Sequence, residues 1–218
     1  MEISLEVDSV LQSFGERTIL SDVYFKCMPG DVIALFGWNG SGKSTLFNII
    51  FGSYKGERSF VRINGKVMTG KAFQSGLIAY LPQTDFLPKN MTVRKVAQLY
   101  LPKDTTLFED IDFSIIEDSK IWELSGGELR YLEIKLILSR PAPFILLDEP
   151  FNGLSPVVAE KVRADIAGCS DTKGIILTDH NFREVHKIAN RFLLLDQGYI
   201  KELKEAGELA SYGYYEQD

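Results

Sequence analysis

The sequence predicts an α/β fold built around a mostly parallel sheet. Three observations support this fold class. Four short runs, at 32–36, 144–147, 174–178 and 192–195, are apolar on both faces, as strands covered by helices on each side should be. Helical patterns alternate with these runs, which is typical of α/β domains. A glycine-rich loop follows the first run and leads directly into a helical pattern.

Helices are expected between and after the apolar runs. Gly52 is placed to end the first of them, since glycine often terminates a helix. The four expected helices are 44–51, 126–139, 156–167 and 181–189.

The first thirty residues have a different pattern. Short strand-like pieces interrupted by Gly15 and by Pro29-Gly30 indicate antiparallel hairpins packed at one edge of the core. Asn64-Gly65 and Gln197-Gly198 are two further hairpin turns. The expected N-terminal pieces are 3–7, 10–14, 18–20 and 23–27.

The stretch from residue 84 to 121 lacks strong strand runs. Helices are expected there at 92–101 and 112–121, which favours a small inserted helical lobe over about 84–139. Residues 1–83 and 140–218 would then form a RecA-like core with its antiparallel β subdomain. We expect residues 1–218 to make up a single domain of this kind, because 218 residues suffice for one generous domain.

Composition narrows the classes of function. The net charge is −6 and the pI about 5.1, which argues against nucleic acid as a partner. No apolar run reaches the roughly 18 residues of a membrane span, and the N-terminus lacks the pattern of a secretory signal. Cys27 and Cys169 are far apart in the sequence and have no metal-binding spacing, so we expect two reduced thiols in a cytosolic protein.

The glycine-rich loop fits the pattern G-x-x-x-x-G-K-[ST]. It lies between a predicted strand and a predicted helix, which is the context that this phosphate-binding motif requires. The glycines allow backbone N–H groups to turn inward, and the helix start adds positive potential for phosphate oxygens. A lysine between the β- and γ-phosphates and a hydroxyl for Mg²⁺ complete the site. The residues are Gly37, Trp38, Asn39, Gly40, Ser41, Gly42, Lys43, Ser44 and Thr45.

Two acids end the second apolar run. The carboxyl end of such a strand lies at the usual ligand edge of an open α/β sheet, beside the phosphate-binding loop. Asp148 is expected to bind Mg²⁺ directly or through water, and Glu149 to orient and polarise an attacking water.

Three further segments are in the order typical of one family. Leu124-Ser125-Gly126-Gly127-Glu128 resembles the signature motif of ATP-binding-cassette (ABC) ATPases, Gln83 its glutamine loop and His180 its switch histidine. The resemblance covers the chain from Phe14 to about Ile200. It implies a P-loop NTPase fold and hydrolysis of Mg-ATP.

The resemblance also implies roles and partners. Phe14 would lie under adenine, Gln83 would join Ser44 and Asp148 at Mg²⁺, and His180 would bond the γ-phosphate. The residues Ser125, Gly126, Gly127 and Glu128 would touch the ATP of a second ABC subunit, identical or different. A separate integral membrane permease would couple hydrolysis to transport, with this chain at the cytoplasmic face of the membrane.

Three positions depart from the family pattern. Glu128 replaces the commoner glutamine, Trp38 a proline and Ser155 an aspartate that helps couple the two ATP sites. Coupling between the sites is therefore the property in which this chain is expected to differ. Two alternatives to the transporter subunit stay open: a soluble ABC ATPase of cofactor or cluster assembly, and a regulatory cassette that binds ATP without hydrolysing it.

Overall fold

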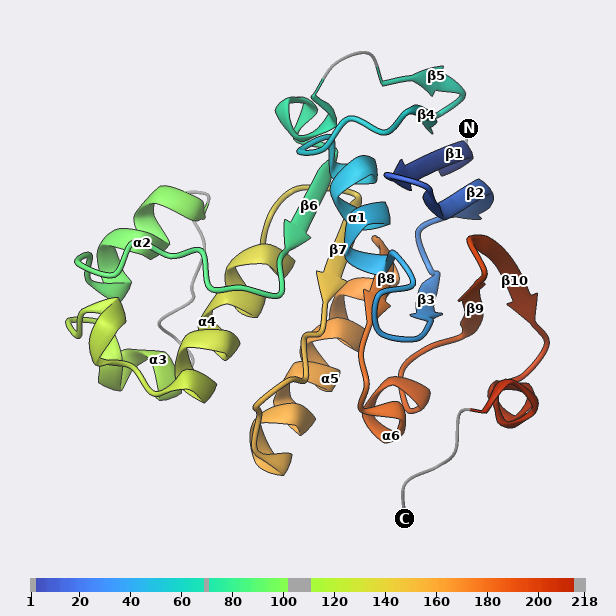
Figure 1. Ribbon diagram of the computed structural model, residues 1–218. Helices are drawn as coiled ribbons and strands as arrows, with labels where there is room; N and C mark the ends of the chain where they lie inside the picture. The colour runs from blue at the N-terminus through green and yellow to red at the C-terminus, as the bar shows by residue number, and fades with distance from the viewer. Residues whose placement is uncertain (1–2, 69–70, 102–110, 214–218) are drawn as a thin grey trace.

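A six-stranded sheet runs through the centre of the computed structural model, which describes residues 3–68, 71–101 and 111–213 (Figure 1). The strand order is β10-β9-β3-β8-β7-β6. The strands from β9 to β6 are parallel, and β10 pairs with β9 in an antiparallel hairpin. The bounds are β3 Val32–Phe36, β6 Ile78–Leu81, β7 Phe144–Asp148, β8 Gly174–Thr178, β9 Arg191–Asp196 and β10 Tyr199–Leu203. The predicted parallel sheet is confirmed, and β6 is an additional strand at its edge.

A second, four-stranded sheet of order β2-β1-β4-β5 is antiparallel, as predicted. The expectation of four short N-terminal pieces was wrong, because they form two long strands. Pairing of β1 with β2 continues past register shifts, near which Ser9 has φ 53° and Asp22 φ 59°. Bulges of this kind interrupt the sequence pattern without ending a strand. The bounds are β1 Leu5–Phe14, β2 Arg17–Cys27, β4 Arg58–Ile63 and β5 Lys66–Val67.

The helices largely follow the predicted spans. The helix expected at 112–121 ends early, since the chain turns after Ile116 and Lys120 pairs with Thr92 in an isolated β-bridge. The helix expected at 181–189 likewise ends at His186. The bounds are α1 Lys43–Phe51, α2 Val93–Tyr100, α3 Ile111–Ile116, α4 Gly126–Leu138, α5 Pro156–Ser170 and α6 Phe182–His186, with short 3₁₀ turns at η1 Ala72–Ser75, η3 Ile121–Glu123 and η4 Ala206–Tyr212.

Two hydrophobic cores lie on opposite faces of the six-stranded sheet. Alternate residues of one strand point to opposite faces. Ala34 and Phe36 accordingly join the core formed with α4 and α5, whereas Ile33 and Leu35 join the core formed with α1 and the antiparallel sheet. Burial on both faces explains why these strands read as continuous apolar runs.

Helices α2, α3 and α4 lie together to one side of the six-stranded sheet (Figure 1). Buried residues of these helices, among them Val96, Phe113 and Leu132, belong to the same core as Leu147 of β7. The helical part is therefore packed continuously onto the sheet. No helix in the described part of the chain is long and apolar enough to cross a bilayer.

Candidate active site

The glycine-rich loop connects β3 to α1, and its backbone requires glycine at defined positions. Gly40 has φ 76° and Gly42, the residue before α1, has φ 107°, a region that side chains disfavour. A Cβ atom at Gly37 would lie 2.5 Å from Ser41 Oγ and 3.0 Å from the Leu195 carbonyl oxygen. The loop therefore curls tightly over the carboxyl end of β3 and ends at the start of α1.

Lys43, the first residue of α1, reaches back across this loop. Its Nζ donates hydrogen bonds to the carbonyl oxygens of Gly37 and Trp38. Burial lowers the pKa of the Lys43 ammonium, while the charges of Glu149 and Asp148 oppose that shift. The ammonium thus lies over a curl of backbone amides, an arrangement suited to binding several phosphate oxygens at once.

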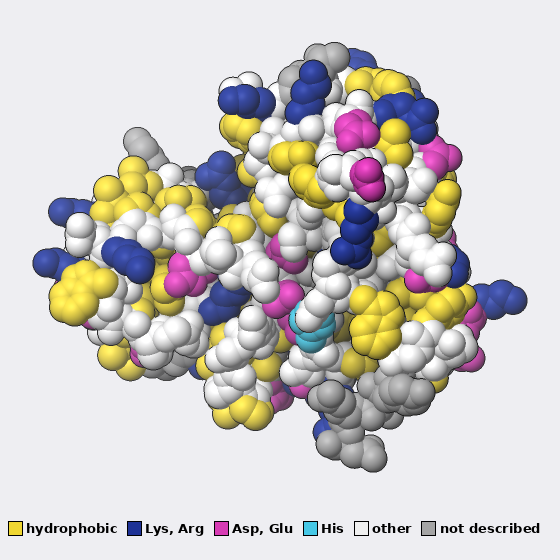
Figure 2. All heavy atoms as spheres, viewed as in Figure 1, with side chains coloured by type: hydrophobic (Ala, Val, Ile, Leu, Met, Phe, Trp, Pro, Cys, Tyr) yellow, Lys and Arg dark blue, Asp and Glu magenta, His cyan; other side chains and the backbone are white. Residues whose placement is uncertain are grey.

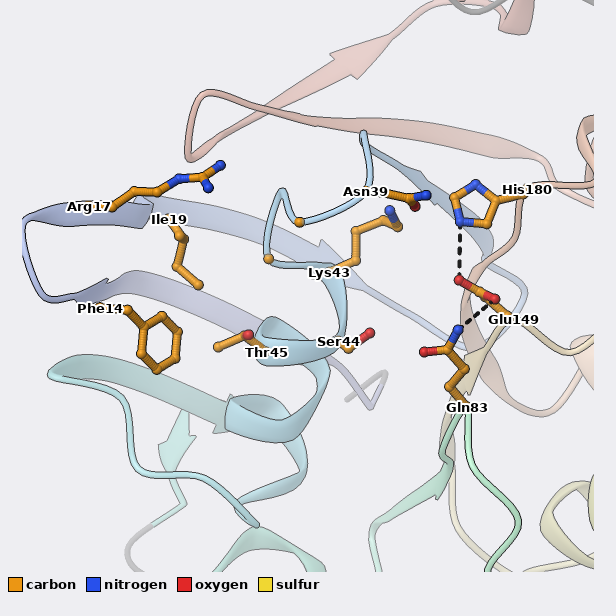
Figure 3. Close-up of a pocket in the computed structure, with 12 residues that line it drawn as sticks. Phe14, Arg17, Ile19, Asn39, Lys43, Ser44, Thr45, Gln83, Glu149 and His180 are labelled. Carbon is orange, nitrogen blue, oxygen red and sulfur yellow. Dashed lines mark hydrogen bonds and ion pairs between the residues drawn. The ribbon is translucent and has the colours of Figure 1, made fainter.

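The loop forms one wall of an elongated cleft of about 680 Å³ (Figure 3). Phe14 and Thr45 lie at one end, Gln83, Glu149 and His180 at the other, and Lys43 and Ser44 between them. Phe14 is 52 % exposed, so its side chain is accessible for stacking. The lining residues are Phe14, Arg17, Ile19, Asn39, Gly40, Gly42, Lys43, Ser44, Thr45, Gln83, Glu149 and His180.

Glu149 is held at the far end of the cleft by three side chains. Its carboxylate accepts hydrogen bonds from Gln83 Nε2 at 2.9 Å and Asn152 Nδ2 at 3.3 Å, and lies 3.1 Å from His180 Nε2. Its backbone has φ 51°, the left-handed region that non-glycine residues seldom adopt. Such strained residues cluster at active sites, where the surrounding structure fixes them.

Asp148 is buried beside the cleft rather than in its lining. Its Oδ1 accepts a hydrogen bond from Thr178 Oγ1 at 2.7 Å, and its Oδ2 one from Tyr80 Oη at 3.2 Å. Asp148 is only 1 % exposed. This geometry suits a carboxylate that acts on a metal ion through an intervening water.

The donor set fits Mg²⁺ by its chemistry. Ser44, Gln83 and Asp148 offer hydroxyl, amide and carboxylate oxygens, the hard ligands that Mg²⁺ prefers together with substrate phosphates and water. The amide nitrogen of Gln83 donates a hydrogen bond to Glu149, so the amide oxygen of Gln83 is the atom available to a cation. The described residues hold no group of three or more His, Cys, Asp and Glu that would suit a cation bound by protein alone.

The signature residues lie outside this cleft, at the start of α4. Ser125 caps the helix and Glu128 completes a capping box, since Ser125 N and Oγ both donate to Glu128 Oε2 at 2.8 and 2.7 Å. A Cβ atom built on Gly126 or Gly127 would meet no other heavy atom within 4 Å. The helix start is therefore open to a partner, and the Glu128 carboxylate is turned toward Ser125.

A second cavity, of about 890 Å³, adjoins the first and shares Asn39, Glu149 and His180 with it. Gly37 and the 58 % exposed Trp38 line this second cavity. Figure 2 shows acidic side chains and a histidine gathered near the centre of the visible face. Of the predicted residues from Phe14 to His180, most therefore line one of the two cavities, whereas the half-buried Ser41 and the buried Asp148 line neither. The signature residues lie outside both cavities, at the start of α4; they are Ser125, Gly126, Gly127 and Glu128.

Several contributors were missed from the sequence. Arg17 and Ile19 of β2 line the cleft, and Thr178 and Tyr80 hold Asp148. Thr178 could have been found, because it ends a predicted parallel strand at the same sheet edge as Asp148. Arg130, whose guanidinium donates to the backbone carbonyls of Asp148 and Glu149, was likewise not anticipated.

Comparison with known proteins identifies the family of this chain. Residues 20–152 match the model of the family described as ABC transporter. The chain belongs to the ABC transporter family. The lipopolysaccharide export system ATP-binding protein LptB of Haemophilus influenzae is 32 % identical over 90 % of this chain and 88 % of its own. A probable ABC transporter ATP-binding protein of Azorhizobium caulinodans is 31 % identical over 91 % of this chain and 76 % of its own.

Solved structures show that the fold is that of ATP-binding cassettes. A nucleotide-free ATP-binding cassette from an ABC transporter has a TM-score of 0.80 and 26 % identity, with 97 % of this chain and 94 % of that chain covered. The protein is an ABC ATPase with the P-loop NTPase fold, an ATP-binding and ATP-hydrolysing subunit of an ABC transporter. The comparisons give no support to the cofactor- or cluster-assembly alternative.

Proposed function

We propose that this ABC ATPase works as a pair of subunits, each ATP lying between the cleft of one chain and the signature helix end of the other. One observation carries the proposal: the phosphate loop, Gln83, Glu149 and His180 share one cleft, whereas Ser125 and its glycines are absent from that cleft's lining and open at the start of α4. A helix N-terminus favours anions. It would complete the site from the partner's side.

Within the cleft, the proposed roles follow the order of the lining residues. Phe14 stacks on adenine, and the loop amides with Lys43 hold the β- and γ-phosphates. Mg²⁺ would be held by Ser44, by the Gln83 amide oxygen and, through water, by Asp148. The metal, when bound, neutralises charge on the phosphates. The proposed order of adenine, phosphates and attacking water follows the order of these side chains along the cleft, from Phe14 at one end to Glu149 at the other (Figure 3).

The hydrolytic roles fall to the two residues at the far end of the cleft. Glu149 would orient a water in line with the γ-phosphate and accept its proton, and His180 would hydrogen-bond the transferring group. The hydrogen bond from Gln83 and the approach of His180 hold the Glu149 carboxylate in the same cleft as Lys43. Positioning of this kind supplies most of the catalysis in phosphoryl transfer.

For the membrane partner, we propose docking on the helical lobe, residues 84–139, which would place the chain at the cytoplasmic face of the membrane. Large apolar side chains are exposed there, with Leu99 64 %, Ile115 76 % and Trp122 59 % exposed. Figure 2 shows hydrophobic side chains gathered over this helical part of the visible face. Gln83 lies directly before the lobe, so a permease seated on it would adjoin a residue in contact with Glu149.

A mixing experiment tests the shared sites. Lys43→Ala damages the cleft of a chain and Ser125→Arg its signature end, so each variant alone should lose ATP turnover. In an equimolar mixture, a symmetric pair would regain one intact site per mixed dimer, or about one quarter of the wild-type activity. As a control, Lys43→Ala mixed with the Lys43→Ala/Ser125→Arg double variant should stay inactive. Absence of recovery in the first mixture would contradict the proposal.

Copurification tests the proposed docking of a membrane permease on the helical lobe. When the tagged chain is expressed in its native organism and purified in mild detergent, an integral membrane protein should copurify with it. A Leu99→Lys/Ile115→Lys variant should lose that protein while keeping its nucleotide affinity. Purification without any membrane protein would contradict the proposed docking.

A further inference from the structure

A buried ion pair on the signature helix is not accounted for by nucleotide binding. Arg130 and Glu133 are three residues apart on α4 and lie 3.3 Å from each other through Arg130 Nη1 and Glu133 Oε2. Arg130 is 6 % exposed and Glu133 fully buried. Replacement of a buried ion pair by apolar residues of similar volume often leaves stability unchanged or increases it. The role of this pair is therefore sought in the hydrogen bonds that it makes to other elements.

Arg130 joins α4 to the end of β7. Its Nη2 donates to the carbonyl oxygens of Asp148 at 2.6 Å and Glu149 at 3.1 Å. These carbonyls flank the residue whose backbone has φ 51°. The guanidinium therefore stabilises the strained backbone that directs the Glu149 side chain into the cleft.

The same pair holds the segment that carries Gln83. Arg130 Nη1 donates to the Pro82 carbonyl oxygen at 2.8 Å, and the backbone N–H of Phe86 donates to Glu133 Oε1 at 2.9 Å. The segment 82–86 is thus fixed to α4 at both ends. Gln83, near its start, donates to Glu149 Oε2 at 2.9 Å, which closes a ring of contacts.

We propose that Arg130 and Glu133 are positioning residues that fix Glu149 and Gln83 relative to the signature helix. This inference rests on the proposed function, in which the start of α4 touches the ATP of the opposite site. Arg130 lies little more than one turn after Ser125 on that helix. Through α4, this ring of contacts would link two ATP sites. The start of the helix would touch the nucleotide in the partner's cleft, and Arg130 on the same helix holds Glu149 in the chain's own cleft. The ring offers a coupling route that does not involve Ser155, which caps α5.

Removal of one partner alone would leave a buried charge and could unfold the chain. The test therefore uses an Arg130→Met/Glu133→Leu double variant, with thermal unfolding as the check on folding. We expect kcat to fall by about 10²-fold, the effect of a misplaced catalytic group, while the nucleotide Kd is unchanged. Arg130→Lys should give an intermediate loss, since an ammonium lacks the fork that reaches several carbonyls. An unchanged kcat in the folded double variant would overturn the proposal.

A matched control and a background variant separate positioning from stability. Lys135, like Arg130 and Glu133, lies on α4. Lys135→Met breaks the 2.9 Å ion pair that joins α4 to Asp165 of α5 and should leave kcat unchanged. In a Glu149→Gln background, the double variant should cause a much smaller further loss of the slow single-turnover hydrolysis than the loss of kcat it causes in the wild type, because most of its effect acts through Glu149 and the Gln83 that holds it. An equal additional loss would show an independent role and overturn the proposal. Full turnover in Glu149→Gln alone would instead contradict the proposed function.

Discussion

The cleft and the signature helix start differ in how their polar groups are satisfied. In the cleft, the Glu149 carboxylate is held by side chains from two other segments and by Asn152 of its own turn. Asp148 accepts a hydrogen bond on each carboxylate oxygen. At the start of α4, the side chains of Ser125 and Glu128 hydrogen-bond to each other within one capping box. The cleft is organised by contacts between distant parts of the chain, which hold its acidic side chains in place. The start of α4 is organised by four consecutive residues, whose hydrogen-bonding groups can be given up to a partner.

This difference follows from where the two regions lie. The carboxyl edge of a parallel sheet collects loops from several strands, which can fix one another. A helix start exposes N–H groups that only a cap, water or a ligand can satisfy. The start of α4 is therefore fully capped as a helix end, and under the proposed pairing it forms a binding site only together with the cleft of a second chain.

The largest expected effect is at the Glu149 end of the cleft. Glu149→Gln removes the proposed base but keeps a side chain of the same shape, so turnover should fall by about 10²- to 10⁴-fold with nucleotide affinity retained. Steady-state ATPase assays and titration with a fluorescent nucleotide measure the two quantities. Glu160→Gln, an exposed position on α5, is the control and should behave as wild type. Comparable turnover in both variants would contradict the catalytic role proposed for Glu149.

A smaller effect is expected at the other end of the cleft. Phe14→Ala removes an exposed ring, and loss of a base–aromatic stack reduces affinity by about 1–3 kcal/mol, or about 5- to 150-fold. Phe14→Tyr keeps the ring and should keep the affinity. Calorimetric titration with a non-hydrolysable ATP analogue measures both. Equal affinities of the Ala variant and wild type would show that adenine lies elsewhere.

The smallest effect concerns the signature end. Glutamine can accept the same hydrogen bonds in a capping box, so Glu128→Gln should change the free energy of unfolding by less than about 0.5 kcal/mol. Removal of the carboxylate should also strengthen ATP-dependent pairing, because one negative charge leaves the region that is proposed to meet the phosphates of the opposite site. Size-exclusion chromatography with ATP in the Glu149→Gln background measures the pairing. Weaker pairing would mean that the carboxylate assists the contact.

Much of the fold was predictable because its strands are buried on both faces. The sequence of β3 is apolar at every position, and the loop after it matches a demanding pattern, so both were located from local sequence. Strand β6 was missed because four residues at a sheet edge give little periodicity. The N-terminal strands were divided wrongly because bulges near Ser9 and Asp22 disturb the alternation.

The site was predictable only where chemistry and sequence motif coincide. Lys43, Glu149 and His180 stand in recognisable patterns, whereas Arg130 acts through backbone carbonyls 18 and 19 residues away. A charged pair within the apolar run of α4 was the available signal. Its partners depend on tertiary packing, which no local pattern encodes.

The separation of the signature end from the cleft has a kinetic consequence. If each ATP site draws parts from two chains, the turnover of the isolated subunit should rise with the square of its concentration when most chains are monomeric. Two copies held on one membrane partner would instead experience an effective concentration set by their spacing. The membrane partner would then control the rate of hydrolysis simply by holding the two copies at the right distance.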